Sequence, residues 1–222
     1  MNLRIFVLHY ANDELTNECL RALVGDAEAV NYGRVTVIDN GSPVPFAGIW
    51  DDVIRFDENL HLIEAFNRAM QQNPADAYIC MANDTKPAPG MVGKLLAALD
   101  DPSVGIVAPG TNDIGAGMLW VPYPSDWAPM DTSNVDNTCW SFRQDLVDKI
   151  GWPDCEGHSH RANWAANQDF CFRARMEGYR VVGVRGAYIE HAHNGGSDID
   201  AWKAGRDWLV MKWGEKAQEV WA

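Results

Sequence analysis

The sequence has little positive charge and no long apolar run. It carries 18 Lys and Arg against 31 Asp and Glu, a formal net charge of −13. The acids are spread along the chain, so nonspecific attraction to nucleic acid or to an anionic membrane is not expected. The N-terminal apolar run Leu3–Leu8 is too short for a secretory signal or for the roughly 20 residues of a membrane span. These absences predict a soluble, unprocessed chain without a transmembrane segment.

Cysteine is scarce and does not form a motif. The five cysteines are an odd number, and no two of them have the Cys-x-x-Cys spacing of common metal and redox sites. Cys80 and Cys171 lie within apolar runs, as buried free thiols do. This pattern favours a reducing, cytoplasmic setting.

Repeats and low-complexity segments are also absent, and 222 residues with 47% hydrophobic content suit one domain with a substantial core. Short Val- and Ile-rich runs alternate with helical periodicity in the first half. The predicted strands are Leu3–Leu8, Val35–Asp39, Val53–Phe56, Ala77–Met81 and Val104–Ala108. The predicted helices between them are Glu14–Leu23, Leu60–Met70 and Met91–Leu99. This alternation predicts a parallel α/β sheet.

After Pro109 the pattern loosens. The stretch Gly110–Asn137 is rich in Gly, Pro, Asp and Trp, and it predicts a long loop of the kind that shapes a site. Helices are predicted at Gln144–Ile150, at Gln168–Glu177 and, with aromatic residues, around Trp202, Trp208 and Trp213. Strands are predicted at Arg180–Val184 and Ala187–His191. The second half is therefore expected to be mixed α and β.

Polar residues directly follow four of the predicted strands. They are the stretches HYAN (9–12), DNGS (39–42), AND (82–84) and EHAHNGGS (190–197). Ligands of open parallel sheets bind outside the carboxyl ends of the strands, so these stretches are candidate binding residues. Each stretch alone also suits a helix cap or a turn, since Asn, Asp, Gly and Ser are turn residues.

The ordered set of motifs resembles the family 2 glycosyltransferases of the GT-A fold, in register from about residue 3 to about residue 197. The matching pieces are HYAN, TVIDNGSP, ENLHLIEAFNRAM, MANDTKPAPG, FRQDLVDKIGWPD, DFCFRARMEGYRV and AYIEHAHNGGS. The resemblance implies one GT-A domain over residues 1–222, with a Rossmann-like, mostly parallel central sheet flanked by helices. Residues 1–109 would form the nucleotide-binding half. Residues 110–222 would form a mixed acceptor-side half with a C-terminal helix.

The resemblance places a nucleotide sugar at the strand ends. Asp39 matches the aspartate that holds the base and ribose in this family, a task that suits a carboxylate acceptor. The other implied donor contacts are His9, Tyr10, Asn59, Asn67, Asn83 and Asp84. His61 stands where the family usually has a glycine, so a ring at this position would narrow the site or touch the donor.

The stretch Ala82–Asp84 occupies the place of the family's metal-binding DxD motif. The resemblance makes Asp84 a metal ligand, with His191 as its partner and His193 as the less favoured alternative. Because a diphosphate must enter a strongly acidic protein, Mn²⁺ or Mg²⁺ is expected between carboxylate and phosphate oxygens. With alanine at position 82, metal binding without nucleotide should be weak. The structural alternative for either histidine is a hydrogen-bonded ring at a strand end.

The general base is expected at the start of a helix. Inverting members of the family carry Glu-Asp-x-Asp there, and this chain has Ala-Asn-Gln-Asp at 166–169, with Asn167 at the usual base position. The resemblance implies that Asp169 removes the acceptor proton as that oxygen attacks the anomeric carbon. An equally weighted alternative is a first-turn acid paired with Arg173. An acid of the Asp126–Asp136 loop is then the next candidate.

The implied function is sugar transfer from a UDP, GDP or dTDP sugar to a hydroxyl acceptor of undefined type, with inversion. Trp140, Trp152 and Trp164 are available to stack on an acceptor sugar. Most of the ten tryptophans must nevertheless be structural, and the C-terminal stripe suits core packing or a homodimer contact.

Two other functions compete with catalysis. The missing acids at positions 82, 166 and 167 are compatible with a degenerate protein that binds a nucleotide or sugar without turnover. A zinc-binding module is the second possibility, although its spacing fits no common zinc signature. Its ligands would be Cys155, His158, His160, His191 and His193.

Overall fold

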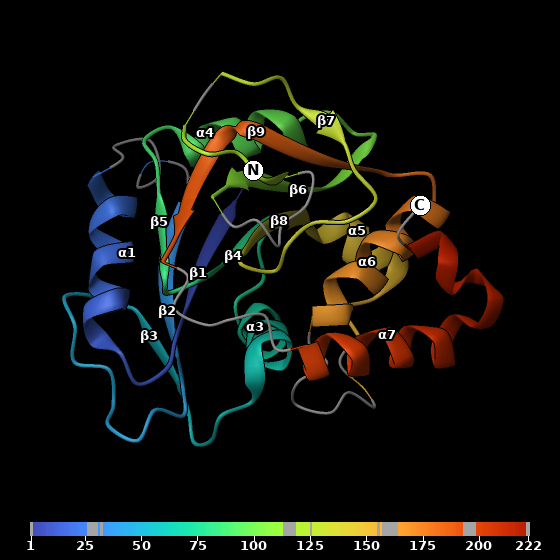
Figure 1. Ribbon diagram of the computed structural model, residues 1–222. Coiled ribbons are helices and arrows are strands. Elements are labelled where there is room, and N and C mark those ends of the chain that lie inside the picture. Colours follow the sequence, from blue (N-terminus) through green and yellow to red (C-terminus); the bar gives the residue numbers. More distant parts are fainter. Residues whose placement is uncertain are drawn as a thin grey trace.

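The computed structural model describes residues 2–25, 31, 33–112, 119–124, 126–154, 156, 164–192 and 199–220. In these residues, nine strands form a single mixed sheet with the order β3-β2-β1-β4-β8-β6-β9-β5, and β7 pairs with β9 (Figure 1). The strands are β1 (Leu3–His9), β2 (Gly33–Asn40), β3 (Val53–Phe56), β4 (Ala77–Ala82), β5 (Thr85–Pro87), β6 (Val104–Thr111), β7 (Met130–Asp131), β8 (Cys139–Arg143) and β9 (Arg180–His191). The helices are α1 (Asp13–Gly25), α3 (His61–Gln72), α4 (Met91–Leu99), α5 (Gln144–Ile150), α6 (Trp164–Met176), α7 (Ile199–Trp213) and the 3-10 helix η2 (Gly214–Val220).

The helices cover both faces of the sheet because its strands are apolar on both sides. Ile5 and Val7 of β1 belong to a cluster with α1 and α4, whereas Phe6 belongs to a second cluster with α3, α5 and α6. Alternate residues of a strand point to opposite faces. Figure 1 accordingly shows α1 and α4 on one side of the sheet, and α3, α5 and α6 on the other.

The predicted α/β class and most predicted elements are confirmed. Strand β3 and helices α4 and α5 have the predicted bounds, and the other predicted strands of the first half differ by only one to three residues at their ends. The two strands expected at Arg180–Val184 and Ala187–His191 are one continuous strand, β9. Pairing with β6 continues across this segment with a register shift, so the glycine at position 186 does not end the strand.

Three strands were not predicted. Strand β8 lies between β4 and β6 and is antiparallel to both, which interrupts the parallel pattern at the centre of the sheet. Strand β5 has three residues and ends in Pro87, and β7 has two. Such short strands carry too little alternation to stand out in a sequence, and proline is confined to edge strands, where no ladder donor is needed.

Four cysteines lie in the described residues, and Cys19, Cys80, Cys139 and Cys171 are all buried free thiols, as expected for Cys80 and Cys171. Burial raises the pKa of Cys19 and of Cys171 to about 12, so both remain protonated at neutral pH. In the part of the chain that the structure describes, no helix is both long and apolar enough to cross a membrane.

Candidate active site

The expected metal ligands lie together at one edge of the sheet. The Asp84 Oδ2 and His191 Nε2 atoms are 3.2 Å apart, although the two residues are 107 positions apart in the chain. The antiparallel pair β5–β9 causes this contact, because Thr85 lies opposite His191. The side-chain amide of Asn112 accepts the His191 N–H at 2.7 Å and donates to its carbonyl at 3.2 Å. The end of β6 thus holds the histidine backbone in place.

One oxygen of Asp84 is left for a ligand. The side chain is one-third exposed. Among the described residues, its buried Oδ1 atom has no hydrogen-bond partner. Buried carboxylate oxygens in native proteins nearly always have a partner, such as a donor, water or an ion. The pair therefore suits a divalent cation with one carboxylate and one imidazole ligand.

His9 and Asn83, next to this edge, are both bonded to Thr16 of α1. The Thr16 hydroxyl on α1 lies 2.7 Å from His9 Nδ1 and 2.9 Å from Asn83 Nδ2, and it donates to the backbone carbonyl of Asn12, just before the helix. His9 is fully buried against Phe46. Burial lowers the pKa of His9, although the charges of neighbouring aspartates oppose the shift. Both side chains are thus bound to α1, whereas Tyr10, the next residue after His9, is 47% exposed.

Asp39 is buried and bonded on both oxygens. It accepts the backbone N–H groups of Ser42 and Phe46, each at 3.0 Å, and it forms an ion pair with Arg55 of β3. Burial alone would raise the pKa of Asp39, but these hydrogen bonds outweigh it and hold the pKa below its usual value. The carboxylate therefore stays ionised and closes the loop after β2. Sequence reasoning missed Arg55, because its partner is 16 residues away on another strand.

The residue in the family's glycine position has a left-handed backbone. His61 has a φ of 60°, a conformation that L-residues other than Asn and Asp rarely adopt. Asn59 Oδ1 accepts the His61 N–H at 2.8 Å, and Asn40 Nδ2 donates to the His61 carbonyl at 3.3 Å. Asn59 also accepts a bond from Asn40 at 3.0 Å. Asn59 therefore organises the turn into α3, and the usual glycine is explained by backbone geometry.

Asp169 lies in a closed corner between α6 and α7. It has no exposed surface, and its Oδ2 accepts the Arg173 Nε–H at 2.8 Å. Its Oδ1 accepts the indole N–H of Trp213 at 2.8 Å and lies 2.8 Å from Lys212 Nζ. The expected pairing with Arg173 is therefore present, but the expected place in the first turn is wrong, because α6 begins at Trp164 rather than at Gln168 and has no acid in its first turn. Lys212 and Trp213 were missed, because nothing in the C-terminal pattern pointed to α6.

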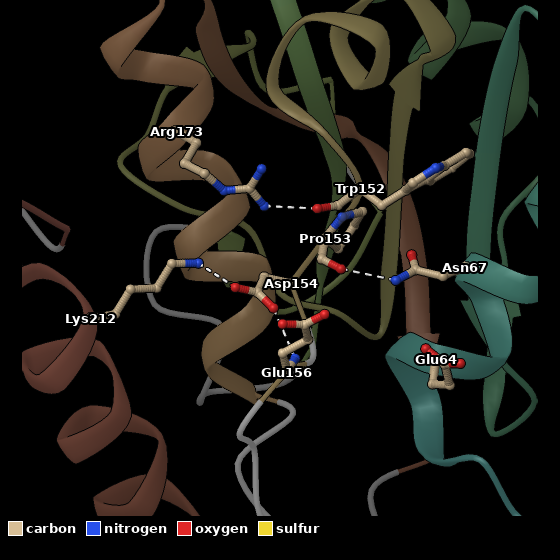
Figure 2. Close-up of a pocket in the computed structure, with 8 residues that line it drawn as sticks. All are labelled: Glu64, Asn67, Trp152, Pro153, Asp154, Glu156, Arg173 and Lys212. Carbon is tan, nitrogen blue, oxygen red and sulfur yellow. Dashed lines mark hydrogen bonds and ion pairs between the residues drawn. The ribbon is translucent and has the colours of Figure 1, made fainter.

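A cavity of about 510 Å³ opens beside this corner (Figure 2). Its lining residues are Glu64, Asn67, Trp152, Pro153, Asp154, Glu156, Arg173 and Lys212. Asn67 Nδ2 donates to the Pro153 carbonyl at 2.9 Å, and Lys212 Nζ lies 2.6 Å from Asp154 Oδ2. Asn67, expected at the donor, thus lies on the side of α3 that faces α6 and α7. Of the three expected acceptor-side tryptophans, Trp152 lines this cavity.

The other predicted sugar-stacking tryptophans and zinc ligands are either in the core or outside the described residues. Trp140 is fully buried in the core, so the structural alternative holds for this residue. Trp208 packs in a small cluster with Trp213 at its edge, which agrees with core packing at the C-terminus. The Trp164 side chain and the proposed zinc ligands Cys155, His158, His160 and His193 lie outside the described residues. In the described ranges, no group of three or more His, Cys, Asp or Glu could hold a metal.

The mixed α/β sheet flanked by helices, with Asp84 and His191 together at one edge, has the architecture of the GT-A fold. The chain belongs to glycosyl transferase family 2, whose model matches residues 9–160. No curated protein matches it significantly by sequence.

Solved structures with a similar fold are also glycosyltransferases. The mannosyltransferase PcManGT from Pyrobaculum calidifontis, solved with GDP-Man and Mn²⁺, has a TM-score of 0.65 and 16% identity, covering 95% of this chain and 60% of that chain. GalNAc-T7, solved with UDP, GalNAc and Mn²⁺, has a TM-score of 0.71 and 10% identity, covering 98% and 50%. TarS 1-349 from S. aureus, solved with UDP-GlcNAc, has a TM-score of 0.67 and 16% identity, covering 95% and 66%. At such identities the likeness shows the fold, and the chain spans one-half to two-thirds of these structures.

Proposed function

We propose that this protein transfers a sugar from a nucleoside diphosphate donor to an acceptor hydroxyl, with inversion and with Mn²⁺ or Mg²⁺. The observation that carries the proposal is the contact between Asp84 and His191 at the sheet edge of a family 2 glycosyltransferase. The structural neighbours support the donor class, since their complexes contain GDP-Man, UDP and UDP-GlcNAc, and two of them contain Mn²⁺.

The metal would be held by Asp84 and His191 and completed by diphosphate oxygens and water. The unpartnered Oδ1 of Asp84 fits this assignment. Two protein ligands are few, so the affinity for the metal should depend on bound diphosphate. When bound, the cation would neutralise the diphosphate as it leaves. Asp84 and His191 supply the ligand atoms, and Asn83, tied to Thr16, orients the turn that carries Asp84.

The nucleoside would bind outside β1 and β2. Tyr10 is exposed there, next to the loop after β2 that Asp39 closes through Ser42 and Phe46. Because both Asp39 oxygens already accept bonds, Asp39 would act on the nucleoside through the shape of this loop. His9 and Asn59 would contribute in the same way, by holding the backbone on which the donor lies.

The acceptor would approach from the side of α6. Inversion in one displacement requires a base within hydrogen-bond reach of the acceptor hydroxyl. Asp169 is the acid that the resemblance implies for this task. Its oxygens are engaged by Arg173, Trp213 and Lys212, so proton removal by Asp169 would require the α6–α7 corner to open.

The decisive experiment is a thermal-shift series with UDP, GDP, dTDP and CDP, each with and without Mn²⁺. A nucleotide at about 100 times its dissociation constant should add about 2.7 kcal/mol to the free energy of unfolding. Asp84→Asn should lose the Mn²⁺-dependent part of this gain and keep the melting temperature of the free protein. The matched control is Asp126→Asn, since Asp126 is a fully exposed carboxylate on the acceptor-side loop.

Metal-dependent stabilisation that survives in Asp84→Asn would contradict the metal assignment. Donor turnover separates the enzyme from the degenerate alternative, so hydrolysis of UDP-GlcNAc, UDP-GalNAc and GDP-mannose is measured with Mn²⁺. Nucleotide binding without turnover of any donor would favour the degenerate protein. For inversion, NMR of the first-formed sugar should show the β anomer from an α-linked donor.

A further inference from the structure

We propose that Asp136, on the loop before β8, is the general base of the reaction, and that Asp169 has a structural role. This inference rests on the proposed glycosyl transfer and assigns one of its chemical steps. The resemblance to the family points to Asp169 on α6 for the base, whereas the contacts of this chain point to the loop before β8.

The pairing of β4 and β8 places Asp136 beside the metal turn. Cys139 lies opposite Met81 in this antiparallel pair, and the last bond runs from Ala82 N to the Thr138 carbonyl at 2.9 Å. Beyond this bond, the segment after β4 continues into Asn83 and Asp84. The segment before β8 contains Asp136 and Asn137. The two aspartates therefore lie at the same end of the β4–β8 pair, each two residues beyond its last bonded residue.

Asp136 has the exposure and the spare acceptor oxygen that a base needs. It is partly exposed, and its Oδ1 accepts the backbone N–H of Thr138 at 2.7 Å. In the described part of the chain, its Oδ2 has no hydrogen-bond partner. One oxygen thus fixes the side chain while the other is free to accept a proton. Asp169 differs in both respects, because it is fully buried and bonded on both oxygens.

The residue at the usual base position supports the Asp136 loop. Asn167 Nδ2 donates to the carbonyl of Val135, the residue before Asp136. An amide cannot remove a proton at neutral pH, but it can hold a backbone in place. An acid at position 167 would lack this donor. At this position of α6 the chain therefore carries an amide that holds the loop of a neighbouring carboxylate.

Unpartnered polar atoms also gather at this place. Among the described residues, the buried Asn137 Nδ2 and Asn167 Oδ1 atoms have no hydrogen-bond partner. Asn137 is two residues after Val135, whose carbonyl binds Asn167, and within the described ranges Asp84 Oδ1 is likewise without a partner at the turn after β4. Buried polar atoms of this kind mark a position for water or a polar ligand. The set contains one donor and two acceptors, which suits a hydroxyl, because a hydroxyl both donates and accepts hydrogen bonds.

The assigned step is a single displacement. The acceptor oxygen forms a bond to the anomeric carbon as its proton passes to Asp136 Oδ2. The bond from that carbon to the diphosphate oxygen breaks, and its electron pair leaves with the diphosphate. In the absence of an acceptor, water takes the place of the hydroxyl and the products are the free sugar and the nucleoside diphosphate.

The test uses hydrolysis of UDP-GlcNAc, UDP-GalNAc and GDP-mannose with Mn²⁺, because water stands in for the undefined acceptor. Asp136→Asn keeps an oxygen for the Thr138 N–H but cannot take a proton, so kcat should fall by about 10²–10⁴-fold. Asp136→Glu should keep part of the turnover. The nucleotide-dependent thermal shift should be unchanged in both variants. Asp126→Asn, which changes an exposed acid before β7, should stay within about twofold of the wild type.

Near-normal turnover in Asp136→Asn would overturn the inference while leaving glycosyl transfer intact. Loss of turnover in a well-folded Asp169→Asn protein, with Asp136→Asn active, would return the base to α6. If the wild-type protein hydrolyses no donor, both the proposed glycosyl transfer and the assignment of Asp136 as its base are contradicted. If Asp136→Asn folds poorly, Asp136→Ser keeps a hydroxyl acceptor for Thr138 and gives a second test of the same loss.

Discussion

The sheet edge that carries Asp84 and the corner that carries Asp169 show two opposite treatments of a carboxylate. Asp84 is one-third exposed, contacts His191 and keeps one oxygen without a partner among the described residues. Asp169 is fully buried, and groups from α6 and the end of α7 bind both of its oxygens. A carboxylate with an oxygen that accepts no hydrogen bond can bind a ligand. A carboxylate bonded on both oxygens instead holds helices together. The comparison predicts that substitutions at the edge change binding and substitutions in the corner change stability.

Asp169→Ala should show the largest effect on stability. Removing it leaves the Arg173 guanidinium, the Trp213 indole N–H and Lys212 without their shared acceptor. Breaking a buried ion pair from one side costs about 3–5 kcal/mol of the free energy of unfolding. Urea unfolding of this variant and of the exposed-site control Asp126→Ala measures the difference. A cost below about 1 kcal/mol would mean that this corner does not join α6 to α7.

Protonation of His9 should have an intermediate, pH-dependent effect on the free energy of unfolding. It lies at the sheet edge but is buried like the corner, near Asp13, Asp39 and Arg55, and burial lowers its pKa. Below about pH 6.5 the unfolded chain gains a proton that the folded ring resists. The free energy of unfolding should therefore fall as pH falls from 6.5 toward the lower folded pKa, by up to about 1.4 kcal/mol per pH unit.

His9→Asn should remove this part of the pH dependence, because an amide can replace the ring donor to Thr16 but does not titrate. Unfolding of the two proteins in urea at pH 7.5 and pH 5.5 provides the comparison. Equal losses in both proteins would assign the pH dependence to other groups.

His61→Gly should show the smallest effect. Relief of a left-handed L-residue contributes about 1–2 kcal/mol, and the greater freedom of glycine in the unfolded chain offsets about 0.5–1 kcal/mol. The variant should be more stable by about 0.5 kcal/mol, whereas His61→Ala should show no such gain. Tighter binding of UDP with Mn²⁺ in His61→Gly would show that the ring narrows the donor site. A loss of stability would show that side-chain contacts of His61 outweigh its backbone strain.

Local pattern was sufficient for much of the fold. The strands β1 to β4 and the helix α4 were predictable because each is a mostly apolar run or a full amphipathic helix, bounded by turn residues. Strand β8 was not, since Ser141 interrupts its short apolar stretch and its buried residues Cys139–Phe142 carry no alternation. A buried strand between two others cannot be distinguished by periodicity from any short apolar segment.

The candidate site divides in the same way. The motif at Ala82–Asp84 and the histidine at position 191 could be recognised from sequence by their resemblance to a family. The relevant partners of Asp39 and Asp169 could not, because Arg55 and Trp213 belong to elements with no pattern linking them to these acids. The support that Asn167 gives to the Asp136 loop was equally invisible, since it depends on a backbone carbonyl 32 residues away.

The sequence by itself determined the α/β class, the position of the polar strand ends and the membership of the chain in a family of transferases. The first two properties follow from side-chain periodicity and turn chemistry, which act over a few residues, and the third follows from the resemblance of the ordered motifs to the family. The tertiary structure alone decided which carboxylates remain open to a ligand. That choice depends on strand pairing and helix packing, which bring groups such as Asp84 and His191 to within 3.2 Å across 107 residues. No local pattern encodes the number of donors that a folded carboxylate will meet.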